Sequence, residues 1–193
     1  MKRVLDIFIA STTFVVATPL ILLISILIII DIGFPVIFKQ KRIGLEGRSF
    51  FILKFRTMKH LSKGDKNDFS RMTVLTSCLR NYSLDELPTL LNVIRGDMSI
   101  VGPRPLLEEY RFEYTPTQFK RHNVRPGITG WAQINGRNSL SWEQKFNLDL
   151  WYVYNHTIIL DLRIILLTFY KIIKKEGINY AQETTMEAFK RKK

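Results

Sequence analysis

The chain has 193 residues and carries 29 lysine and arginine residues against 17 acidic residues, a formal net charge of +12. This length is sufficient for one compact domain with its own hydrophobic core. So basic a balance indicates a polyanionic partner such as nucleic acid, anionic lipid or a phosphorylated substrate, although a merely solubilising positive surface is the plain alternative. The single cysteine, Cys78, excludes an internal disulfide, and no cysteine–histidine cluster has the spacing of a metal site.

An almost unbroken apolar run extends from Ile7 to Ile30, about 24 residues where a bilayer core requires about 20. A signal peptide would have a shorter apolar stretch followed by small residues at a cleavage site, so we reject that interpretation. Two alternatives stay open: a helix that spans the membrane, and a helix-break-helix hairpin that enters one leaflet and returns.

Two features favour the re-entrant hairpin. Pro19 follows Thr18 in the middle of the run, where proline bends a helix and the threonine hydroxyl can satisfy a freed carbonyl. The positive-inside rule favours keeping both ends in the cytoplasm, because both flanks are basic: Lys2 and Arg3 before the run, and Lys39, Lys41 and Arg42 after it. Prolines also occur in spanning helices, so the pattern alone leaves both topologies open.

The remainder of the chain alternates short apolar segments with turns. Apolar residues at 36–38 and 50–53, with a glycine-containing turn at 44–47, predict a β-hairpin. Helical spacing predicts helices over 72–80, 87–94 and 142–154. The polar segment 63–68 and the glycine- and proline-rich segments 102–105 and 125–130 are typical of loops.

Residues 156–175 predict an amphipathic helix with Asp161, Thr168, Lys171 and Lys175 on one face and large apolar residues on the rest. A helix of this kind can lie in the plane of a membrane interface, and packing against the protein's own core is an equal alternative. Residues 181–193 are polar and end in four basic residues, which predicts a mobile tail or a weakly lipid-attracting patch.

The segment from Arg80 to Arg104 concentrates residues suited to phosphate chemistry. Ser83 and Glu86 fit a capping box, and Asp85 would complement a helix dipole, so each of these residues has a sufficient structural reason. The adjacent carboxylates of Asp85 and Glu86 can also bind Mg²⁺ together with substrate phosphates. A carboxylate can in addition attack phosphorus and form an acyl phosphate.

Two arginines support the functional interpretation. Arg80 precedes the expected helix start, where free amides attract phosphate, and the planar guanidinium of Arg104, between two prolines, can clamp phosphate oxygens. The P-loop, the Gly-x-Gly-x-x-Gly fingerprint, His-Glu-x-x-His and Gly-x-Ser-x-Gly are absent from the sequence. Together these observations predict phosphoryl-transfer chemistry.

An ordered series of motifs resembles the bacterial sugar transferases, which are small monotopic phosphoglycosyl transferases. The motifs are KFRTM at 54–58, SLDEL at 83–87, NV at 92–93, GDMS at 96–99, VGPRP at 101–105 and RPGITGWAQINGRN at 125–138. They cover nearly the whole chain, and the similarity extends especially to the transferases that use UDP-diacetylbacillosamine.

The resemblance implies a mainly helical α+β fold. Residues 1–33 would form the re-entrant membrane hairpin, with Thr18–Pro19 at the family's helix-break position, where a Ser-Pro pair is common. Residues 34–180 would form a small cytoplasmic catalytic domain with a β-hairpin and interfacial helices, followed by a basic tail at 181–193. The protein would be monotopic in the bacterial cytoplasmic membrane, with its catalytic domain on the cytoplasmic face.

The resemblance also implies a reaction. A UDP-sugar, such as UDP-diacetylbacillosamine or another UDP-N-acetylamino sugar, would donate its sugar 1-phosphate to undecaprenyl phosphate and release UMP. This is the first membrane step of surface-glycan assembly, and downstream glycosyltransferases could then extend the product. Asp85 would be the nucleophile of a covalent aspartyl-phosphosugar intermediate and a ligand of Mg²⁺, with Glu86 as second ligand or as base.

Binding roles are implied in the same way. Phosphate groups would be held by Arg80, Arg104, Lys54 and Arg56, and the nucleotide sugar by Gln133, Arg137 and Asn138. The expected partners are the UDP-sugar, undecaprenyl phosphate and the bilayer, and nucleic acid is not expected.

Two other functions stay open from the sequence. A membrane-bound, Mg²⁺-dependent phosphatase or nucleotide-sugar hydrolase could use the same acids, and it would turn over without a lipid phosphate. A non-enzymatic basic membrane adaptor or nucleic-acid binder would explain the charge and the apolar run, but not the concentration of acids and arginines at 80–104.

Overall fold

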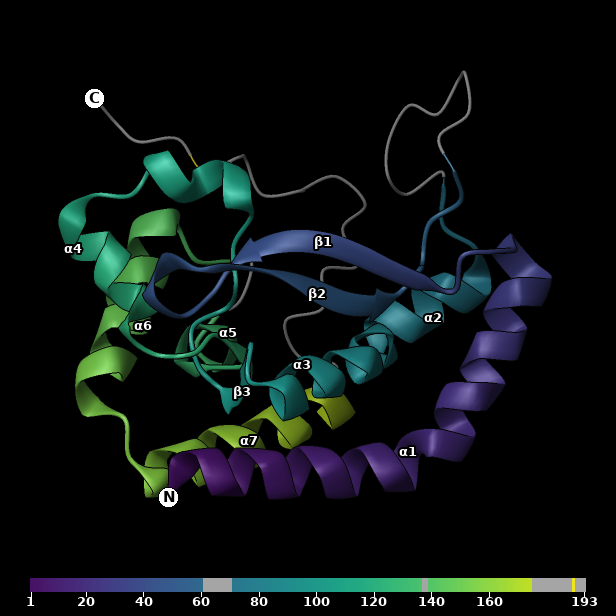
Figure 1. Ribbon diagram of the computed structural model, residues 1–193, viewed down its shortest axis with the longest axis horizontal. Helices are drawn as coiled ribbons and strands as arrows, with labels where there is room; N and C mark the ends of the chain where they lie inside the picture. Colours follow the sequence, from purple (N-terminus) through teal and green to yellow (C-terminus); the bar gives the residue numbers. More distant parts are fainter. Residues whose placement is uncertain (61–70, 137–138, 175–188, 190–193) are drawn as a thin grey trace.

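A computed structural model describes residues 1–60, 71–136, 139–174 and 189 (Figure 1). It confirms the mainly helical α+β fold. In chain order the elements are α1 (Lys2–Ile32), β1 (Ile37–Ile43), η1 (Leu45–Gly47), β2 (Ser49–Phe55), α2 (Val74–Asn81), η3 (Leu84–Thr89), α3 (Leu90–Arg95), β3 (Ser99–Val101), η4 (Glu108–Phe112), α4 (Pro116–Phe119), η5 (Lys120–Asn123), β4 (Gly127–Thr129), α5 (Trp131–Ile134), α6 (Trp142–Asn155) and α7 (Ile158–Lys174), where η denotes a 3₁₀ helix.

The N-terminal helix α1 is hydrogen-bonded as one element but turns sharply near its middle (Figure 1). Pro19 is the proline inside it, and the Thr18 hydroxyl donates to the carbonyl of Phe14 at 2.9 Å. Proline removes one backbone donor and clashes with the preceding turn, which explains the bend. Within the described residues, α1 is the one helix long and apolar enough to cross a membrane, and little of its apolar stretch is buried.

Polar residues attach the first turns of α1 to the strand β3. The buried Asp6 carboxylate accepts from the Ser99 hydroxyl at 2.8 Å and from the backbone N–H of Ile100 at 3.1 Å. The Arg3 guanidinium donates to the carbonyls of Ile94 and Met98 at 3.2 and 3.3 Å. Since each of these contacts satisfies a polar group away from water, the start of the apolar helix is fixed on the domain.

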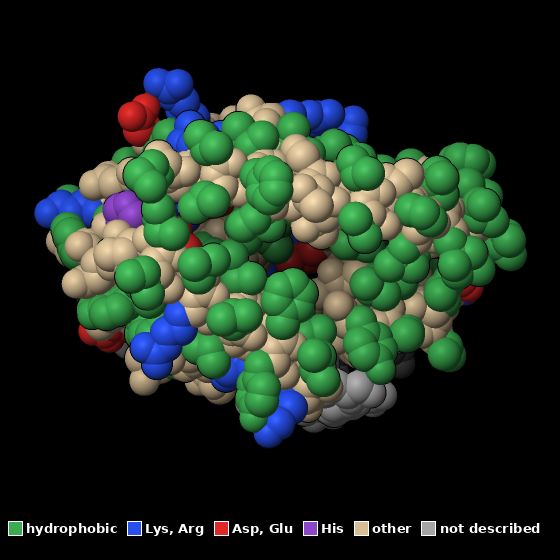
Figure 2. Space-filling view, turned by 90° about the horizontal axis from the view of Figure 1, so that it is seen from below, with side chains coloured by type: hydrophobic (Ala, Val, Ile, Leu, Met, Phe, Trp, Pro, Cys, Tyr) green, Lys and Arg blue, Asp and Glu red, His purple; other side chains and the backbone are tan. Residues whose placement is uncertain are grey.

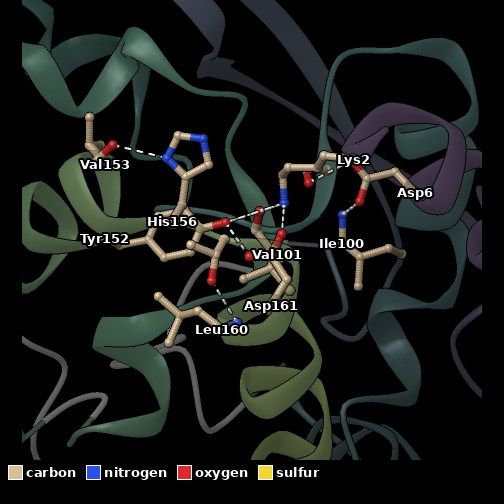
Figure 3. Close-up of polar contacts among 11 residues, drawn as sticks. Lys2, Asp6, Ile100, Val101, Tyr152, Val153, His156, Leu160 and Asp161 are labelled. Carbon is tan, nitrogen blue, oxygen red and sulfur yellow. Dashed lines mark hydrogen bonds and ion pairs between the residues drawn. The ribbon is translucent and has the colours of Figure 1, made fainter.

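Lys2 extends this attachment to the C-terminal helices. Its ammonium group lies 2.5 Å from Asp161 Oδ2 of α7, 3.2 Å from the Tyr152 hydroxyl of α6 and 3.1 Å from the carbonyl of Val101 (Figure 3). Tyr152 also donates to Asp161 Oδ1 at 2.6 Å. The cluster therefore joins α1, β3, α6 and α7 at one point.

The predicted β-hairpin is confirmed and is longer than expected. Strands β1 and β2 pair antiparallel from Ile37 opposite Phe55 to Ile43 opposite Ser49. The connection turns through Glu46 and Gly47, which have φ of 52° and 76°. Two-residue alternation directs Ile52 toward α3 and the core beneath the hairpin.

A second, parallel pairing was not predicted. Ser99 and Val101 of β3 lie opposite Gly127 and Thr129 of β4, so the prediction of a loop throughout 125–130 is wrong. A Cβ on Gly127 would lie 2.1 Å from the backbone nitrogen of Gly102, so this close approach requires glycine. The pairing fixes the start of the loop that carries Arg104.

Helix α7 reverses the usual orientation of an amphipathic surface helix. Two of its polar residues face the protein: Asp161 bonds to Lys2, and the Thr168 hydroxyl lies 2.7 Å from that of Thr129. Exposed apolar side chains cover its other side: Ile159, Leu162, Leu166, Phe169 and Ile173. The prediction that this helix packs against the protein's own core is therefore confirmed for its inner face, and its location in a membrane interface stays a prediction that the exposed apolar side supports.

This apolar side of α7 and the first half of α1 lie along one face of the molecule (Figure 1). Seen from below, hydrophobic side chains spread over that face, and an acidic side chain is visible in a hollow near its centre (Figure 2). Lys175 and nearly all of the predicted tail lie outside the described residues. Phe189 is the exception, and it is buried in an aromatic cluster with Tyr110, Tyr114, Trp142 and Phe146.

Candidate active site

Asp85 and Glu86 lie on the short 3₁₀ helix η3, between α2 and α3. The predicted capping box is wrong, because Ser83 has a left-handed backbone with φ of 56° and makes no side-chain cap. Glu86 is instead oriented by charge: its Oε1 lies 2.5 Å from Lys54 Nζ and 3.6 Å from Arg104 Nη2. A tertiary ion pair has replaced the local hydrogen bond that the sequence pattern offers.

Asp85 is buried, with 9% of the residue exposed, and lies within a cluster of charges. Burial raises its pKa, and the adjacent Glu86 raises it further, whereas Lys54, Arg80 and Arg104 act in the opposite direction. A carboxylate held close to both like and opposite charges is typical of functional sites. The structure therefore brings together five predicted residues: Asp85, Glu86, Lys54, Arg80 and Arg104.

A pocket beside this pair combines polar and apolar walls. Lys54, Glu86 and Arg104 line one part of it. Ile52, Met98 and Ile128 contribute apolar surface. Such a pocket can take a molecule with an anionic part and a less polar part.

Arg56 does not belong to this group. Its guanidinium donates to the carbonyls of Ile32, at 2.6 Å, and Gly33, and lies 2.8 Å from His60 Nε2. It therefore caps the C-terminal end of α1, where unpaired carbonyls attract a cation. These contacts hold the guanidinium outside the pocket, so the structure does not bring Arg56 together with the other predicted phosphate-binding residues.

Gln133 lies on α5, and within the described part of the chain both polar atoms of its buried side-chain amide have no hydrogen-bond partner. An unpaired buried amide is costly and is compatible with a ligand that completes it. It does not line the pocket beside Glu86. Arg137 and Asn138, the other two residues predicted for the nucleotide sugar, lie outside the described residues.

Two basic residues near the site were missed. Arg42 of β1 lines the same pocket, and Lys145 belongs to α6. Burial and, after it, the positive charge of Arg104 lower the pKa of both residues. In the sequence, Arg42 was interpreted only as part of the basic flank that follows the apolar run. The signal that could have found it is the two-residue alternation of the hairpin, which places Arg42 on the same face as Lys54 once the register is known.

The acidic pair is also the position that best suits a metal ion. Within the residues that the structure describes, no group of three or more histidine, cysteine or acidic side chains could hold one. Mg²⁺ is commonly bound by one or two carboxylates and completed by substrate phosphates and water. Asp85 with Glu86 fits a metal that is shared with a diphosphate, and does not fit a closed, all-protein site.

A buried ion pair supports the loop that carries Arg104. The Arg121 guanidinium donates to Asp149 Oδ2 at 2.7 Å and to the backbone carbonyl of Arg104, also at 2.7 Å. Both side chains of the pair are almost fully buried. The Arg104 backbone is thus held from inside the domain while its side chain reaches toward Glu86.

Comparison with known proteins places this site in a family. The chain is 49% identical over 193 residues to the uncharacterized sugar transferase EpsL of Bacillus subtilis, an alignment that covers 98% of this chain and 95% of that protein. It is 38% identical to the exopolysaccharide production protein ExoY of Rhizobium meliloti, over 91% of this chain and 87% of that protein.

A longer relative is the UDP-glucose:undecaprenyl-phosphate glucose-1-phosphate transferase of Escherichia coli, at 37% identity over 89% of this chain. The alignment covers 40% of that enzyme. The family model of the bacterial sugar transferases matches residues 1–175, which include α1, the acidic pair and α7. The chain therefore belongs to the bacterial sugar transferases, an enzyme family.

Proposed function

We propose that this enzyme transfers a sugar 1-phosphate from a UDP-sugar to undecaprenyl phosphate and releases UMP. The observation that carries the proposal is the buried Asp85, adjacent to Glu86 and close to Lys54, Arg80 and Arg104. This arrangement offers a carboxylate nucleophile together with cations for phosphate oxygens. The names of several relatives, which specify UDP-sugars and undecaprenyl phosphate or a lipid carrier, support the same reaction.

The proposed chemistry has two displacements at one phosphorus. An oxygen of the Asp85 carboxylate attacks the sugar-bearing phosphorus, the bond to the bridging oxygen breaks, and UMP leaves. A phosphate oxygen of the lipid then attacks the same phosphorus, the bond to Asp85 breaks, and the carboxylate is regenerated. No proton is consumed in either step, so the residues nearby act by placing substrates and by stabilising negative charge.

Each neighbouring residue has a role in this scheme. Arg104 and Arg80 bind phosphate oxygens, and Lys54 holds Glu86 beside the nucleophile. Mg²⁺, bound by Asp85 with help from Glu86, would supply charge neutralisation on the diphosphate. Because Lys54 and Arg104 already neutralise Glu86, we assign Glu86 an electrostatic and positioning role rather than the role of a general base.

The membrane topology forms part of the proposal. The bend in α1 and the exposed apolar side of α7 would place both helices in the cytoplasmic leaflet (Figures 1 and 2). Helix α1 would enter this leaflet and return, so that both of its ends lie on the cytoplasmic side. The site would then lie at head-group depth, where a lipid phosphate meets a soluble nucleotide. The enzyme would carry out the first membrane step of surface-glycan assembly, and downstream glycosyltransferases would use its product.

The donor sugar divides the proposal into two options. Sequence similarity favoured a UDP-N-acetylamino sugar such as UDP-diacetylbacillosamine, whereas named relatives use UDP-glucose or UDP-galactose. Detergent-purified enzyme should therefore be incubated with each UDP-sugar, undecaprenyl phosphate and Mg²⁺, and the release of UMP measured. We expect UMP from one donor class, and we expect continuous UMP release, beyond a single turnover, only when the lipid phosphate is present.

Two results would contradict the proposed reaction. Continuous turnover without lipid phosphate would indicate a nucleotide-sugar hydrolase. No UMP from any donor, combined with salt-sensitive binding of DNA, would indicate a basic adaptor. For the topology, tags at Met1 and Lys193 should both be accessible only from the cytoplasm, and external labelling of Met1 alone would show a true span.

A further inference from the structure

The pocket beside the acidic pair contains more positive charge than its carboxylate can neutralise. Arg42, Lys54 and Arg104 line it together with Glu86. Lys54 forms a close ion pair with Glu86 at 2.5 Å, and Arg104 lies 3.6 Å from the same oxygen atom. Like charges gathered in one pocket favour an anion that neutralises them.

Within the described part of the chain, Arg42 is the cation of this group that forms no ion pair with a carboxylate, although Glu86 lies near enough to raise its pKa. Among the described residues, Nη1 donates to the carbonyl of Pro105 at 3.2 Å and Nη2 to Gln40 Oε1 at 2.6 Å, both of them neutral acceptors. Its Nε is buried and has no hydrogen-bond partner there. Burial and the neighbouring Arg104 lower the pKa of Arg42 to about 10, which still leaves it charged at neutral pH.

The position of Arg42 relative to Asp85 indicates which phosphate it meets. Lys54, which pairs with Glu86 beside Asp85, lies opposite Phe38 in the hairpin, and Arg42 lies four positions farther along β1 than Phe38. Arg42 lies at the Pro105 side of the pocket, on the opposite strand of the hairpin from Lys54. In the proposed reaction, Asp85 meets the sugar-bearing phosphorus, so a cation farther from Asp85 faces the phosphate that stays with the nucleoside.

On the basis of the proposed function, we propose that Arg42 binds the nucleoside-bound phosphate of the UDP-sugar and holds it in the departing UMP. A guanidinium can donate two parallel hydrogen bonds to one phosphate. The buried Nε–H of Arg42, which has no partner among the described residues, could donate one of them. This contact would stabilise the charge that develops on the leaving group when the bridging P–O bond breaks. Arg42 is thus assigned to the leaving group, and Arg104 and Arg80 to the transferred phosphate.

The neighbouring Lys41 provides a matched control. It lies on the same strand and carries the same charge, but it is exposed and, by two-residue alternation, points to the opposite face of the hairpin. The variants Arg42→Gln and Lys41→Gln therefore remove one positive charge each from adjacent positions. They separate a specific contact from a general loss of charge.

The test is the affinity of the detergent-purified full chain for UMP in the presence of Mg²⁺, measured by calorimetry. We expect Arg42→Gln to weaken UMP binding by about 10- to 100-fold, the range for a lost hydrogen-bonded charge, and Lys41→Gln to leave it within about 2-fold. The KM for the UDP-sugar should rise with Arg42→Gln, whereas the KM for undecaprenyl phosphate should stay unchanged. Arg42→Lys should restore part of the affinity, and it replaces Arg42→Gln as the test variant if the latter does not fold.

Equal UMP affinity in the Arg42 and Lys41 variants would overturn this assignment. A rise in the KM for the lipid phosphate alone would also overturn it, because it would show that Arg42 binds the acceptor substrate. If the wild-type enzyme turns over UDP-sugar and binds UMP, and the Arg42 variants do so equally well, only the assignment of Arg42 is contradicted. Wild-type protein without either property contradicts the proposed function itself.

Discussion

Two charged clusters of this protein lie on either side of Arg104, and they differ in how evenly their positive and negative charges are matched. Inside the domain, Arg121 and Asp149 pair one to one at 2.7 Å, and Arg121 also bonds the backbone of Arg104. In the pocket, the side chain of Arg104 joins several cations around Glu86 and Asp85. The first cluster is complete without a ligand, whereas the second one is crowded with charge that a phosphorylated substrate would balance.

The difference separates a structural ion pair from a functional site. Buried pairs hold a fold when each partner is satisfied, and loss of one partner leaves an uncompensated charge. Charges that are gathered without balance raise the free energy of the folded state and are retained where a ligand or a reaction uses them. Substitutions in the two clusters should therefore have opposite effects on activity and stability.

Substitution of the proposed nucleophile should have the largest effect. Asp85→Asn should reduce turnover by at least about 1000-fold, as for other residues that form a covalent intermediate. The melting temperature should stay the same or rise, because burial of the Asp85 charge is unfavourable and the amide removes it. Turnover near the wild-type rate would contradict the assignment, and a large loss of melting temperature would give Asp85 a structural role.

The buried pair should show the opposite behaviour. Asp149→Asn should lower the free energy of unfolding by about 3–5 kcal/mol, because it leaves the buried Arg121 without its counter-charge. Replacing both partners, with Arg121→Met and Asp149→Leu, should cost less than the single change. Denaturant unfolding measures both values, and a stable Asp149→Asn variant would remove the distinction between the two clusters.

Arg104 belongs to both clusters through different atoms, so its side chain can be tested separately. Arg104→Ala should raise the KM for the UDP-sugar by about 10- to 100-fold, as expected for a lost charged hydrogen bond, with little change in stability, since Arg121 holds the backbone. Arg48→Ala is the control, because Arg48 is an exposed arginine at the turn of the same hairpin. A KM for the UDP-sugar equal to that of the Arg48→Ala control would exclude phosphate binding by Arg104.

The smallest effect concerns the pH dependence of kcat/KM. Asp85 must be ionised to attack, so activity should fall as the pH falls through its pKa, which burial and Glu86 raise above the ordinary value for aspartate. Removing the negative neighbour with Glu86→Gln should move this acidic limb to lower pH. Removing a cation with Arg80→Gln should move it to higher pH. Shifts in the same direction would show that the limb reports another group.

The sequence predicted the elements that depend on local pattern. The β-hairpin and α6 follow from apolar spacing within one segment, and α7 was placed within a few residues of its ends. The polar face of α7 was also recognised, but its orientation was not. That orientation depends on Lys2, more than 150 positions away, which attracts Asp161 into the domain.

Features that depend on distant partners could not be predicted in the same way. Strands β3 and β4 have three residues each and pair across 25 intervening positions, so neither has a recognisable period. The capping box at Ser83 failed because Lys54 and Arg104 bind the glutamate that it requires. Arg56 lies two positions after Lys54 in the same family motif, yet its guanidinium binds the carbonyls at the end of α1.

Intact-protein mass spectrometry can detect the proposed covalent intermediate on Asp85. Wild-type enzyme incubated with its UDP-sugar and Mg²⁺, without lipid phosphate, should release about one UMP per protein and gain the mass of one sugar phosphate on Asp85. Undecaprenyl phosphate should then remove that mass, and Asp85→Asn should never acquire it. If the lipid must be present before any UMP is released, and the protein gains no mass, transfer is direct and Asp85 is not the nucleophile.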